Sequence, residues 1–160
     1  MARATTANIH LEALRYNLAQ IRLAAPYSRL RAVVKADGYG RGLERVALAL
    51  TTADAFGVAS LSDAQRLRAV GLQQKIVLLS GFDEYSDLEQ IRNLSLDTVV
   101  HHQSQVDILL EDSGTPINVW LKMDSGMHRL GFAPEQFHQV YHQLKAMPNI
   151  ADDICSMRHF

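Results

Sequence analysis

The sequence has little of the material from which several classes of protein are built. Its single cysteine, Cys155, excludes an internal disulfide and any metal cluster made of cysteines. Its apolar runs are short and broken by charged residues, so no membrane span is predicted. A formal net charge of -1 leaves no basic surface for a nucleic acid. We therefore expect neither a nucleic-acid partner nor a membrane partner.

The N-terminal stretch MARATTANIH lacks the apolar segment of a secretory signal, so the cytoplasm is the expected location. The chain also lacks a linker, a low-complexity tract and a short-period repeat. With 160 residues, of which 48% are hydrophobic and 21% charged, it has the size and composition of one globular domain.

What the sequence does contain is an alternation of two kinds of segment. Leu11, Leu14, Leu18 and Ile21 recur at helical spacing and predict a first helix that ends at about Ala25. Six short apolar runs without helical period follow it and are predicted to be strands: LRAVVK, AFGVAS, KIVLLS, LDTVVH, INVWLKM and DICSMRHF. Segments with helical spacing separate these runs.

Apolar strands that are each followed by a helix indicate a parallel sheet covered by helices, so we predict an α/β fold. Local signals agree with this order. Gly71 and Gly114 are predicted to close two helices, and Pro134 to lie in the first turn of another.

The pattern alone leaves two architectures open. A doubly wound open sheet is complete with about six strands, whereas a (β/α)8 barrel needs about eight strands and ~250 residues. The length of this chain by itself favours the open sheet.

In both architectures ligands bind at the carboxyl ends of the strands. Lys35 ends the first predicted strand and Tyr39 follows it, Lys122 lies on the fifth strand with Arg129 after it, and His159 ends the last. This set is rich in cations and poor in carboxylates, which favours an anionic ligand over a metal ion.

Lys35 has two readings from its surroundings alone. Three apolar residues precede it and favour partial burial, a setting in which an amine can act as a nucleophile, and the glycines of DGYGRG can offer amides to a phosphate. A lysine at a strand end is, however, most often a solvated surface residue.

Longer motifs add to this reading. AVVKADGYGRG resembles the cofactor-lysine motif of alanine racemases, LKMDSGMHRLGF resembles a second signature of that family, and the terminal RHF a third. The resemblance runs from about Asn8 to Phe160 with the motifs in order. It implies that residues 1–160 are the N-terminal part of a pyridoxal-phosphate-binding barrel, an incomplete (β/α)8 barrel of about six βα units without the C-terminal β domain.

The resemblance also implies roles for the candidate residues. Lys35 holds pyridoxal 5'-phosphate as a Schiff base and acts as a catalytic base, and Tyr39 binds the cofactor phosphate. Arg129 contacts the carboxylate of the substrate alanine and the cofactor phenolic oxygen. Lys122, a carbamate in some members, orients that arginine, and His159 lies beside the cofactor ring. No metal is implied.

The implied function is the interconversion of L- and D-alanine for peptidoglycan precursors, by an enzyme that works as a homodimer. A tyrosine from the C-terminal half of the partner subunit supplies the second base in the family, and this chain has no such half. Arg41 stands in place of the histidine of the family motif, and Arg158 in place of serine or threonine. Two alternatives are a non-catalytic pyridoxal-phosphate-binding barrel of the homeostasis type and an inactive remnant.

Overall fold

The computed structural model describes residues 4–159, so the final residue of the RHF motif, Phe160, lies outside the described residues. Six strands are present: β1 (Arg31–Val33), β2 (Ala55–Val58), β3 (Lys75–Leu78), β4 (Leu96–Val100), β5 (Asn118–Lys122) and β6 (Cys155–Met157). Seven helical segments accompany them among the described residues: α1 (Leu11–Ala24), α2 (Lys35–Gly40), α3 (Leu43–Ala49), α4 (Leu61–Ala69), α5 (Tyr85–Asn93), α6 (Gln103–Glu111) and α7 (Pro134–Lys145).

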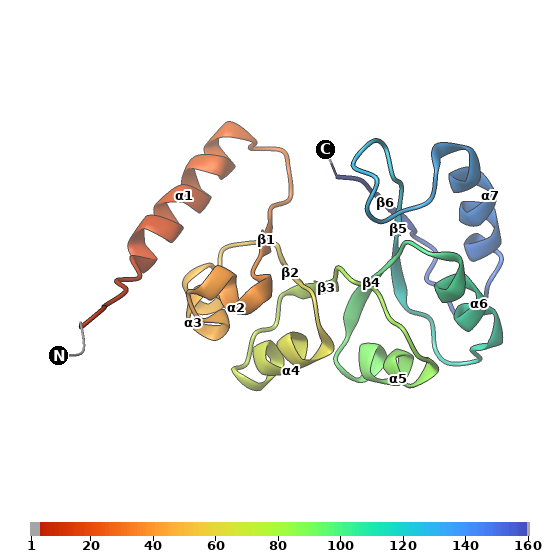
Figure 1. Ribbon diagram of the computed structural model, residues 1–160, viewed down its shortest axis with the longest axis horizontal. Helices are drawn as coiled ribbons and strands as arrows, with labels where there is room; N and C mark the ends of the chain where they lie inside the picture. Colours follow the sequence, from red (N-terminus) through yellow and green to blue (C-terminus); the bar gives the residue numbers. More distant parts are fainter. Residues whose placement is uncertain (1–3, 160) are drawn as a thin grey trace.

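The order of the strands decides between the two architectures. The six strands lie in the order β1-β2-β3-β4-β5-β6, and every neighbouring pair is parallel. A doubly wound sheet reverses its strand order at a switch point, whereas a barrel adds each strand on the same side. The sheet curves accordingly, with α2 to α7 on its outer side (Figure 1). The predicted partial barrel is confirmed, and the open sheet is wrong.

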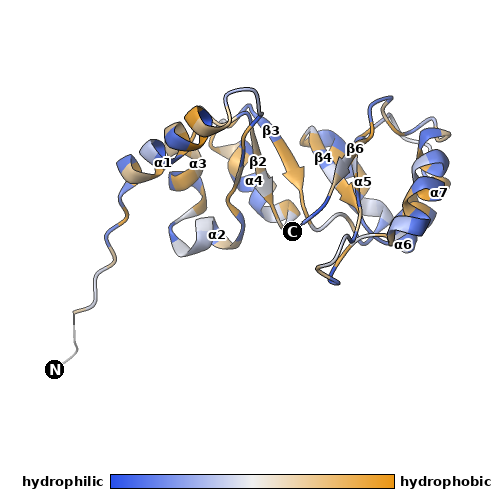
Figure 2. Ribbon diagram, turned by 90° about the horizontal axis from the view of Figure 1, so that it is seen from above, coloured by the Kyte–Doolittle hydropathy of each residue, from blue (hydrophilic) through white to orange (hydrophobic). Residues whose placement is uncertain are grey.

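The hydrophobic core lies between the convex side of the sheet and the helices. Alternate strand residues point to this side, among them Phe56, Ile76, Val100 and Leu121, each of which is fully buried. The strands accordingly carry much of the hydrophobic colour in Figure 2. The short apolar runs form strands with one side in this layer, and the helices that follow β1 to β5 cover that side.

A cation–π contact crosses the concave side of the sheet. The guanidinium of Arg31 on β1 lies 3.9 Å from the centre of the Trp120 ring on β5. The Trp120 indole in turn donates a hydrogen bond to Asp97 on β4, with a nitrogen-to-oxygen distance of 3.1 Å. Burial lowers the pKa of the Arg31 guanidinium, and the Asp97 carboxylate opposes this shift. The contact joins strands that are far apart in the sheet order.

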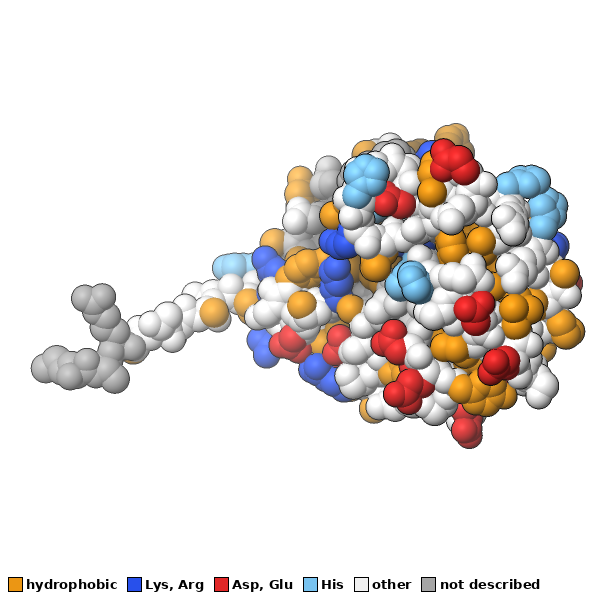
Figure 3. Space-filling model, turned by 45° about the vertical axis from the view of Figure 1, so that its right-hand side comes forward, with side chains coloured by type: hydrophobic (Ala, Val, Ile, Leu, Met, Phe, Trp, Pro, Cys, Tyr) orange, Lys and Arg blue, Asp and Glu red, His pale blue; other side chains and the backbone are white. Residues whose placement is uncertain are grey.

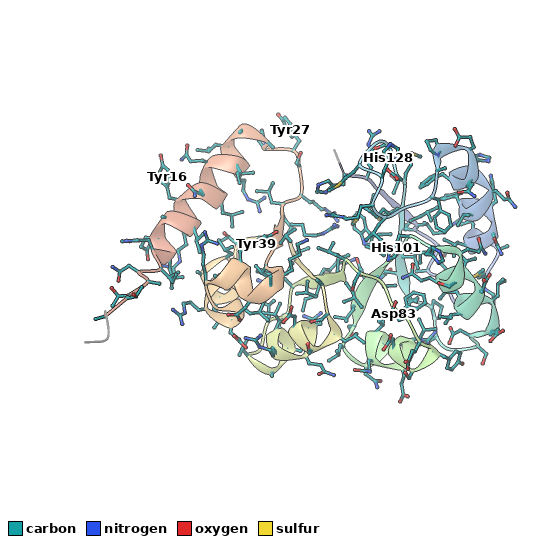
Figure 4. The ribbon with its side chains drawn as sticks, in the orientation of Figure 1. Tyr16, Tyr27, Tyr39, Asp83, His101 and His128 are labelled. Atoms are coloured by element: carbon teal, nitrogen blue, oxygen red, sulfur yellow. The ribbon has the colours of Figure 1, made fainter. Side chains whose placement is uncertain are left out.

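The predicted first helix is present as α1, but only part of its apolar face is covered. Leu18 is buried, whereas Ile21 is 53% exposed. Tyr16 on the helix and Tyr27 after it also point into solvent (Figure 4). Neither α1 nor another helix among residues 4–159 is long and apolar enough to cross a membrane.

Two of the three predicted helix signals are confirmed. Pro134 is the first residue of α7. Gly71 has φ +83° after α4, and the amides of Gly71 and Leu72 donate to the carbonyls of Arg68 and Leu67 at 3.0 and 3.1 Å. These two bonds are a Schellman motif, which closes the helix as glycine there predicts.

The prediction for Gly114 is wrong, because α6 ends at Glu111, before that glycine. A Cβ atom at Gly114 would lie 2.3 Å from the guanidinium carbon of Arg92. Glycine at this position leaves room for the Arg92 guanidinium and does not mark a helix end.

Arg92, Asp112 and Asn149 form a buried network at the amino ends of the strands. Arg92 on α5 forms a two-pronged ion pair with Asp112, the residue after α6, whose side chain is 1% exposed. The Asn149 amide donates to the Asp112 carboxylate at 2.7 Å and to the Leu109 carbonyl at 2.8 Å. Burial acts to raise the pKa of the Asp112 carboxyl, but the bonds from Arg92 and Asn149 outweigh it and lower the pKa. This network ties together three successive βα units.

Candidate functional site

All five candidate residues line one cavity of about 500 Å³ at the carboxyl ends of the strands. Lys35 and Tyr39 reach it from α2, Lys122 from the end of β5, and His159 from beyond β6. The predictions that Lys35 ends the first strand and His159 the last are wrong, because β1 ends at Val33 and β6 at Met157. Arg129 enters it from the loop between β5 and α7. Segments more than 120 positions apart in the sequence therefore meet here, as the parallel sheet predicts.

The segment α2, which carries Lys35 and Tyr39, is a left-handed turn. Ala36, Asp37, Gly38 and Tyr39 have φ between 53° and 63° and ψ between 36° and 52°. These values lie in the left-handed region, which L residues other than glycine rarely adopt. Three residues with side chains share this conformation, which the glycines of DGYGRG alone do not predict.

Backbone contacts define the turn. The Gly38 amide donates to the Val34 carbonyl at 2.9 Å, and the Gly42 amide donates to the Asp37 carbonyl at 2.8 Å. Gly38 is buried, and a Cβ atom there would lie 3.1 Å from the Val46 side chain on α3. The turn is therefore packed against the next helix.

The loop that carries Arg129 is organised by Asp124. The Asp124 carboxylate accepts the amides of Gly126 and His128 at 3.1 and 2.9 Å. These bonds, the one from His128 first, lower the pKa of Asp124. At the base of the loop the Phe132 amide donates to the Lys122 carbonyl at 2.9 Å, which returns the chain to the end of β5. Arg129 therefore projects from a short closed loop.

Lys122 is the most buried of the candidate side chains. It is 8% exposed, and its ammonium forms no hydrogen bond or ion pair with any residue that the structure describes. Burial, and then the charge of Arg129, lower the pKa of Lys122, while Asp124 acts in the opposite direction. A buried cation beside a second cation is unfavourable unless an anion joins them or the amine loses its charge.

The charged residues that line the cavity are all cationic. Arg31 and Arg158 line it together with Lys35, Lys122 and Arg129, and no described carboxylate lines it. In Figure 3, Lys and Arg side chains lie mostly toward the left of the globular part, and most Asp and Glu side chains lie below and to the right. No group of three possible metal ligands is found within residues 4–159. The arrangement suits an anionic ligand that an amine can attack.

The model of the family "Alanine racemase, N-terminal domain" matches residues 9–160, almost the whole chain. The chain belongs to this family. The resemblance drawn from the sequence motifs is thereby confirmed.

Individual alanine racemases support the same assignment. The chain is 52% identical over 155 residues to the alanine racemase of Shewanella woodyi and, to the same degree, to that of Shewanella baltica strain OS155. In each comparison the match covers 96% of this chain and 43% of the relative. The chain thus spans less than half the length of the curated racemases that it matches.

Solved racemase structures have the same fold. Biosynthetic alanine racemase from Pseudomonas aeruginosa superposes with a TM-score of 0.88 at 39% identity, over 94% of this chain and 42% of that one. The racemase from Acinetobacter baumannii gives 0.83 at 31% identity, over 95% and 45%. The six-stranded partial barrel is therefore the fold that racemases share in this region.

Sequence reasoning missed one group of residues near the site, Asp37, Glu44 and Arg66. The guanidinium of Arg66 on α4 binds the carboxylates of both acids. Arg66 is 22 or more positions away from the two acids along the chain, so no local pattern links them. Only the register of β1 and β2 brings α2, α3 and α4 together.

Proposed function

We propose that the protein supplies the cofactor-binding barrel part of a pyridoxal-phosphate-dependent alanine racemase, within residues 1–160. The reaction is the interconversion of L- and D-alanine, which serves peptidoglycan precursor synthesis in the cytoplasm. The single observation that carries the proposal is the cation-lined cavity in which Lys35, Tyr39, Lys122, Arg129 and His159 meet.

The cavity fits the cofactor in size and charge. Small-molecule sites commonly occupy about 300–1,000 Å³, and this one has about 500 Å³. Pyridoxal phosphate and alanine together bring a phosphate and a carboxylate, and the cavity offers several cationic groups for them. It also offers an amine, Nζ of Lys35, for the cofactor aldehyde.

Three residues would hold the cofactor. Lys35 supplies the amine for the covalent link, Tyr39 donates its hydroxyl to the phosphate, and His159 lies beside the ring. The left-handed turn supports this assignment, because it brings Lys35 and Tyr39 into the same cavity from positions only four apart.

Lys35 also moves the proton in this proposal. Pyridoxal phosphate, when bound, supplies the conjugated ring that spreads the negative charge of a carbon that has lost its proton. Once free of the cofactor, Nζ of Lys35 stands beside the substrate carbon and accepts its proton on one face. Racemisation needs a second group on the opposite face. We assign that group to a partner subunit of a homodimer, as the family resemblance implies.

Arg129 binds the substrate carboxylate, and Lys122 orients Arg129. As a plain ammonium, Lys122 would repel the neighbouring guanidinium. The lowered pKa of Lys122 increases the neutral fraction of its amine. A neutral amine can add carbon dioxide through a new N–C bond and release a proton to solvent, which gives a carbamate. The carbamate is an anion, so it would pair with Arg129. An intact mass without added carbon dioxide, together with a well-resolved map of a plain amine, would refute this assignment.

The proposal is tested by trapping the cofactor. The chain is incubated with pyridoxal phosphate, reduced with borohydride and digested, and the modified lysine is identified by mass spectrometry. We expect saturable modification of Lys35 and its loss in Lys35→Ala. The modification should be retained in Lys75→Ala, which removes an exposed lysine at the amino end of β3. Absence of saturable modification at Lys35 refutes the cofactor site.

Alanine turnover is measured separately by circular dichroism of L-alanine solutions. Modification of Lys35 without turnover by this chain indicates cofactor binding without catalysis, since the second base is assigned to a partner subunit. Modification with turnover shows that residues 1–160 suffice for the reaction.

A further inference from the structure

The left-handed turn carries a steric cost that glycine does not remove. Ala36, Asp37 and Tyr39 all have positive φ, of 53°, 53° and 56°. For residues with a Cβ atom this conformation costs about 1–2 kcal/mol each, although aspartate tolerates it better than most. Such strain persists only where the surroundings hold it, and it is concentrated at functional sites. Contacts around the turn must therefore hold it in this conformation.

Arg66 lies at the centre of those surroundings. Its Nε and Nη2 atoms donate to the two carboxylate oxygens of Glu44 at 2.7 and 2.9 Å. Nη2 also donates to Oδ1 of Asp37 at 3.0 Å, and Nη1 lies 3.5 Å from Oδ1 of Asp63. One guanidinium thus joins the turn α2, the start of α3, and α4.

Asp37 transmits this contact to the backbone. The same Oδ1 atom that accepts from Arg66 also accepts the amide of Leu43 at 3.1 Å. Leu43 is fully buried and is the first residue of α3. Asp37 therefore links the middle of the strained turn to a fixed point in the core.

The charges in this group stabilise one another. The Leu43 amide, and then Arg66, lower the pKa of the Asp37 carboxyl. Arg66 likewise lowers the pKa of Glu44, and Glu44 and Asp37 raise the pKa of Arg66. All of these groups remain ionised near neutral pH, so the contacts persist there.

We propose that Arg66 is a positioning residue that holds the turn from Lys35 to Tyr39 in its left-handed form, and so presents both side chains to the cavity before a ligand binds. This inference rests on the proposed function only for the identity of that ligand. The position of the turn itself can be tested without a cofactor.

A different view treats these contacts as ordinary surface ion pairs, which contribute little. The chain contains a matched control for that view. The carboxylate of Asp54 accepts the amide of Leu30 at 2.7 Å and the guanidinium of Arg22 at 2.9 Å. This is the same arrangement of one aspartate, one amide and one arginine, but the backbone around it is not left-handed.

The first measurement is hydrogen exchange by mass spectrometry on peptides that cover residues 36–43, without cofactor. In Arg66→Met we expect exchange in these residues to rise about fivefold, as it would if the closed turn were lost from most molecules. Arg66→Lys keeps the charge but loses the two-pronged contact, so we expect a smaller rise. Arg22→Met should leave residues 36–43 unchanged. Unchanged exchange in both Arg66 variants overturns the proposal.

A second variant separates strain relief from general loss of packing. Glycine at position 36 removes the Cβ atom and adopts positive φ freely. We expect Arg66→Met/Ala36→Gly to recover most of the slow exchange that Arg66→Met loses. A merely structural role of Arg66 in α4 would not be corrected from position 36, so lack of recovery counts against the positioning role.

The second measurement is the rate at which borohydride traps pyridoxal phosphate on Lys35. We expect it to fall about fivefold in Arg66→Met, in proportion to the population of the closed turn, and to recover with Ala36→Gly. If the unmodified chain traps no cofactor while the exchange results hold, the proposed function fails and the role of Arg66 stands. If trapping falls while exchange is unchanged, Arg66 acts in another way and this proposal is wrong.

Discussion

An arginine–aspartate pair lies at each end of the sheet, but the two pairs differ in burial and in the backbone that they hold. At the amino ends, Arg92 meets Asp112 in a buried network in which the carboxylate is 1% exposed. At the carboxyl ends, Arg66 meets Asp37, whose side chain is 53% exposed, beside a strained turn. The first pair joins segments with ordinary backbone conformations, and the second holds a conformation that the backbone disfavours.

The two pairs differ in what happens when one partner is lost. A buried pair cannot lose one partner without leaving a charge in the interior, so it fixes the packing of α5, α6 and the segment after α7. An exposed pair leaves no buried charge when it is broken, so its loss is expected to release the turn without unfolding the sheet. Catalytic groups of barrels lie at the carboxyl ends of the strands, where the Arg66–Asp37 pair lies here.

The largest effect is expected from breaking the buried pair. Asp112→Ala leaves Arg92 without its carboxylate and removes an acceptor of Asn149, so the free energy of unfolding should fall by about 3–5 kcal/mol. Urea unfolding, followed by circular dichroism, measures this loss. The matched control is Asp107→Ala on α6, an exposed site that should change stability little. Equal effects of the two variants would contradict the comparison.

The next largest effect is expected at the packed glycine of the strained turn. Gly38→Ala adds a Cβ atom at φ 63°, 3.1 Å from Val46, and should cost about 2 kcal/mol. Gly40→Ala has similar strain at φ 77°, but nothing lies within 4 Å of its added atom. The difference between the two variants in urea unfolding isolates the contribution of packing against α3. If Gly40→Ala costs as much as Gly38→Ala, packing is not what fixes the turn.

A smaller effect of opposite sign is expected at Ala36. Ala36→Gly removes the penalty for positive φ, about 1–2 kcal/mol. It also costs about 0.5–1 kcal/mol, because glycine loses more conformational entropy than alanine when the chain folds. The net result should be a gain of about 0.5–1 kcal/mol in the free energy of unfolding. The same change at Ala47, a fully buried position in α3, should destabilise the chain. A loss at position 36 would show that the left-handed conformation is not strained.

The smallest effect is expected from salt. Exposed charges are screened at 1 M salt, where the Debye length is about 3 Å, whereas buried pairs are screened far less. Hydrogen exchange in residues 36–43 should therefore rise modestly in 1 M sodium chloride, while exchange around Asp112 should not change. Equal responses at both ends would remove the distinction between the two networks.

Low pH is expected to weaken both networks. Asp37 and Asp112 have lowered pKa values in the folded chain, so their contributions are complete above their ordinary value of about 3.9 and are lost as the pH falls below it. Unfolding measured between pH 5 and pH 2.5 should show stability falling with pH. Asp112→Asn and Asp37→Asn should each reduce this dependence, because each removes a carboxyl whose pKa is lowered in the folded chain.

Much of the fold could be predicted from the sequence. The first helix lies where its pattern placed it and each of the six apolar runs contains a strand, because helical spacing and apolar runs are local signals. The strand ends were less well predicted, since β1 and β6 end before Lys35 and His159. The end of α6 was not predicted, since Gly114 serves the guanidinium of Arg92, a residue that the chain brings near only on folding. The choice of a barrel came from the motif resemblance, because periodicity carries no information on strand order.

The candidate site was predicted in part. The sequence motifs identified Lys35, Tyr39, Lys122, Arg129 and His159, and the structure places all five around one cavity. Arg66 carried no signal of its own, because an arginine on the exposed face of a helix is usually solvated. Its position opposite Asp37 depends on the pairing of β1 with β2 and on the path of the chain between them.

The sequence by itself determined the α/β alternation, the amine at the end of the first strand and the positive character of the ligand site. These follow from residue type and spacing, which act over a few positions. The tertiary structure alone decided the consecutive strand order, the left-handed path from Ala36 to Tyr39 and the arginine that holds it. Contacts between distant segments set these features, and no local pattern encodes the energy of such contacts.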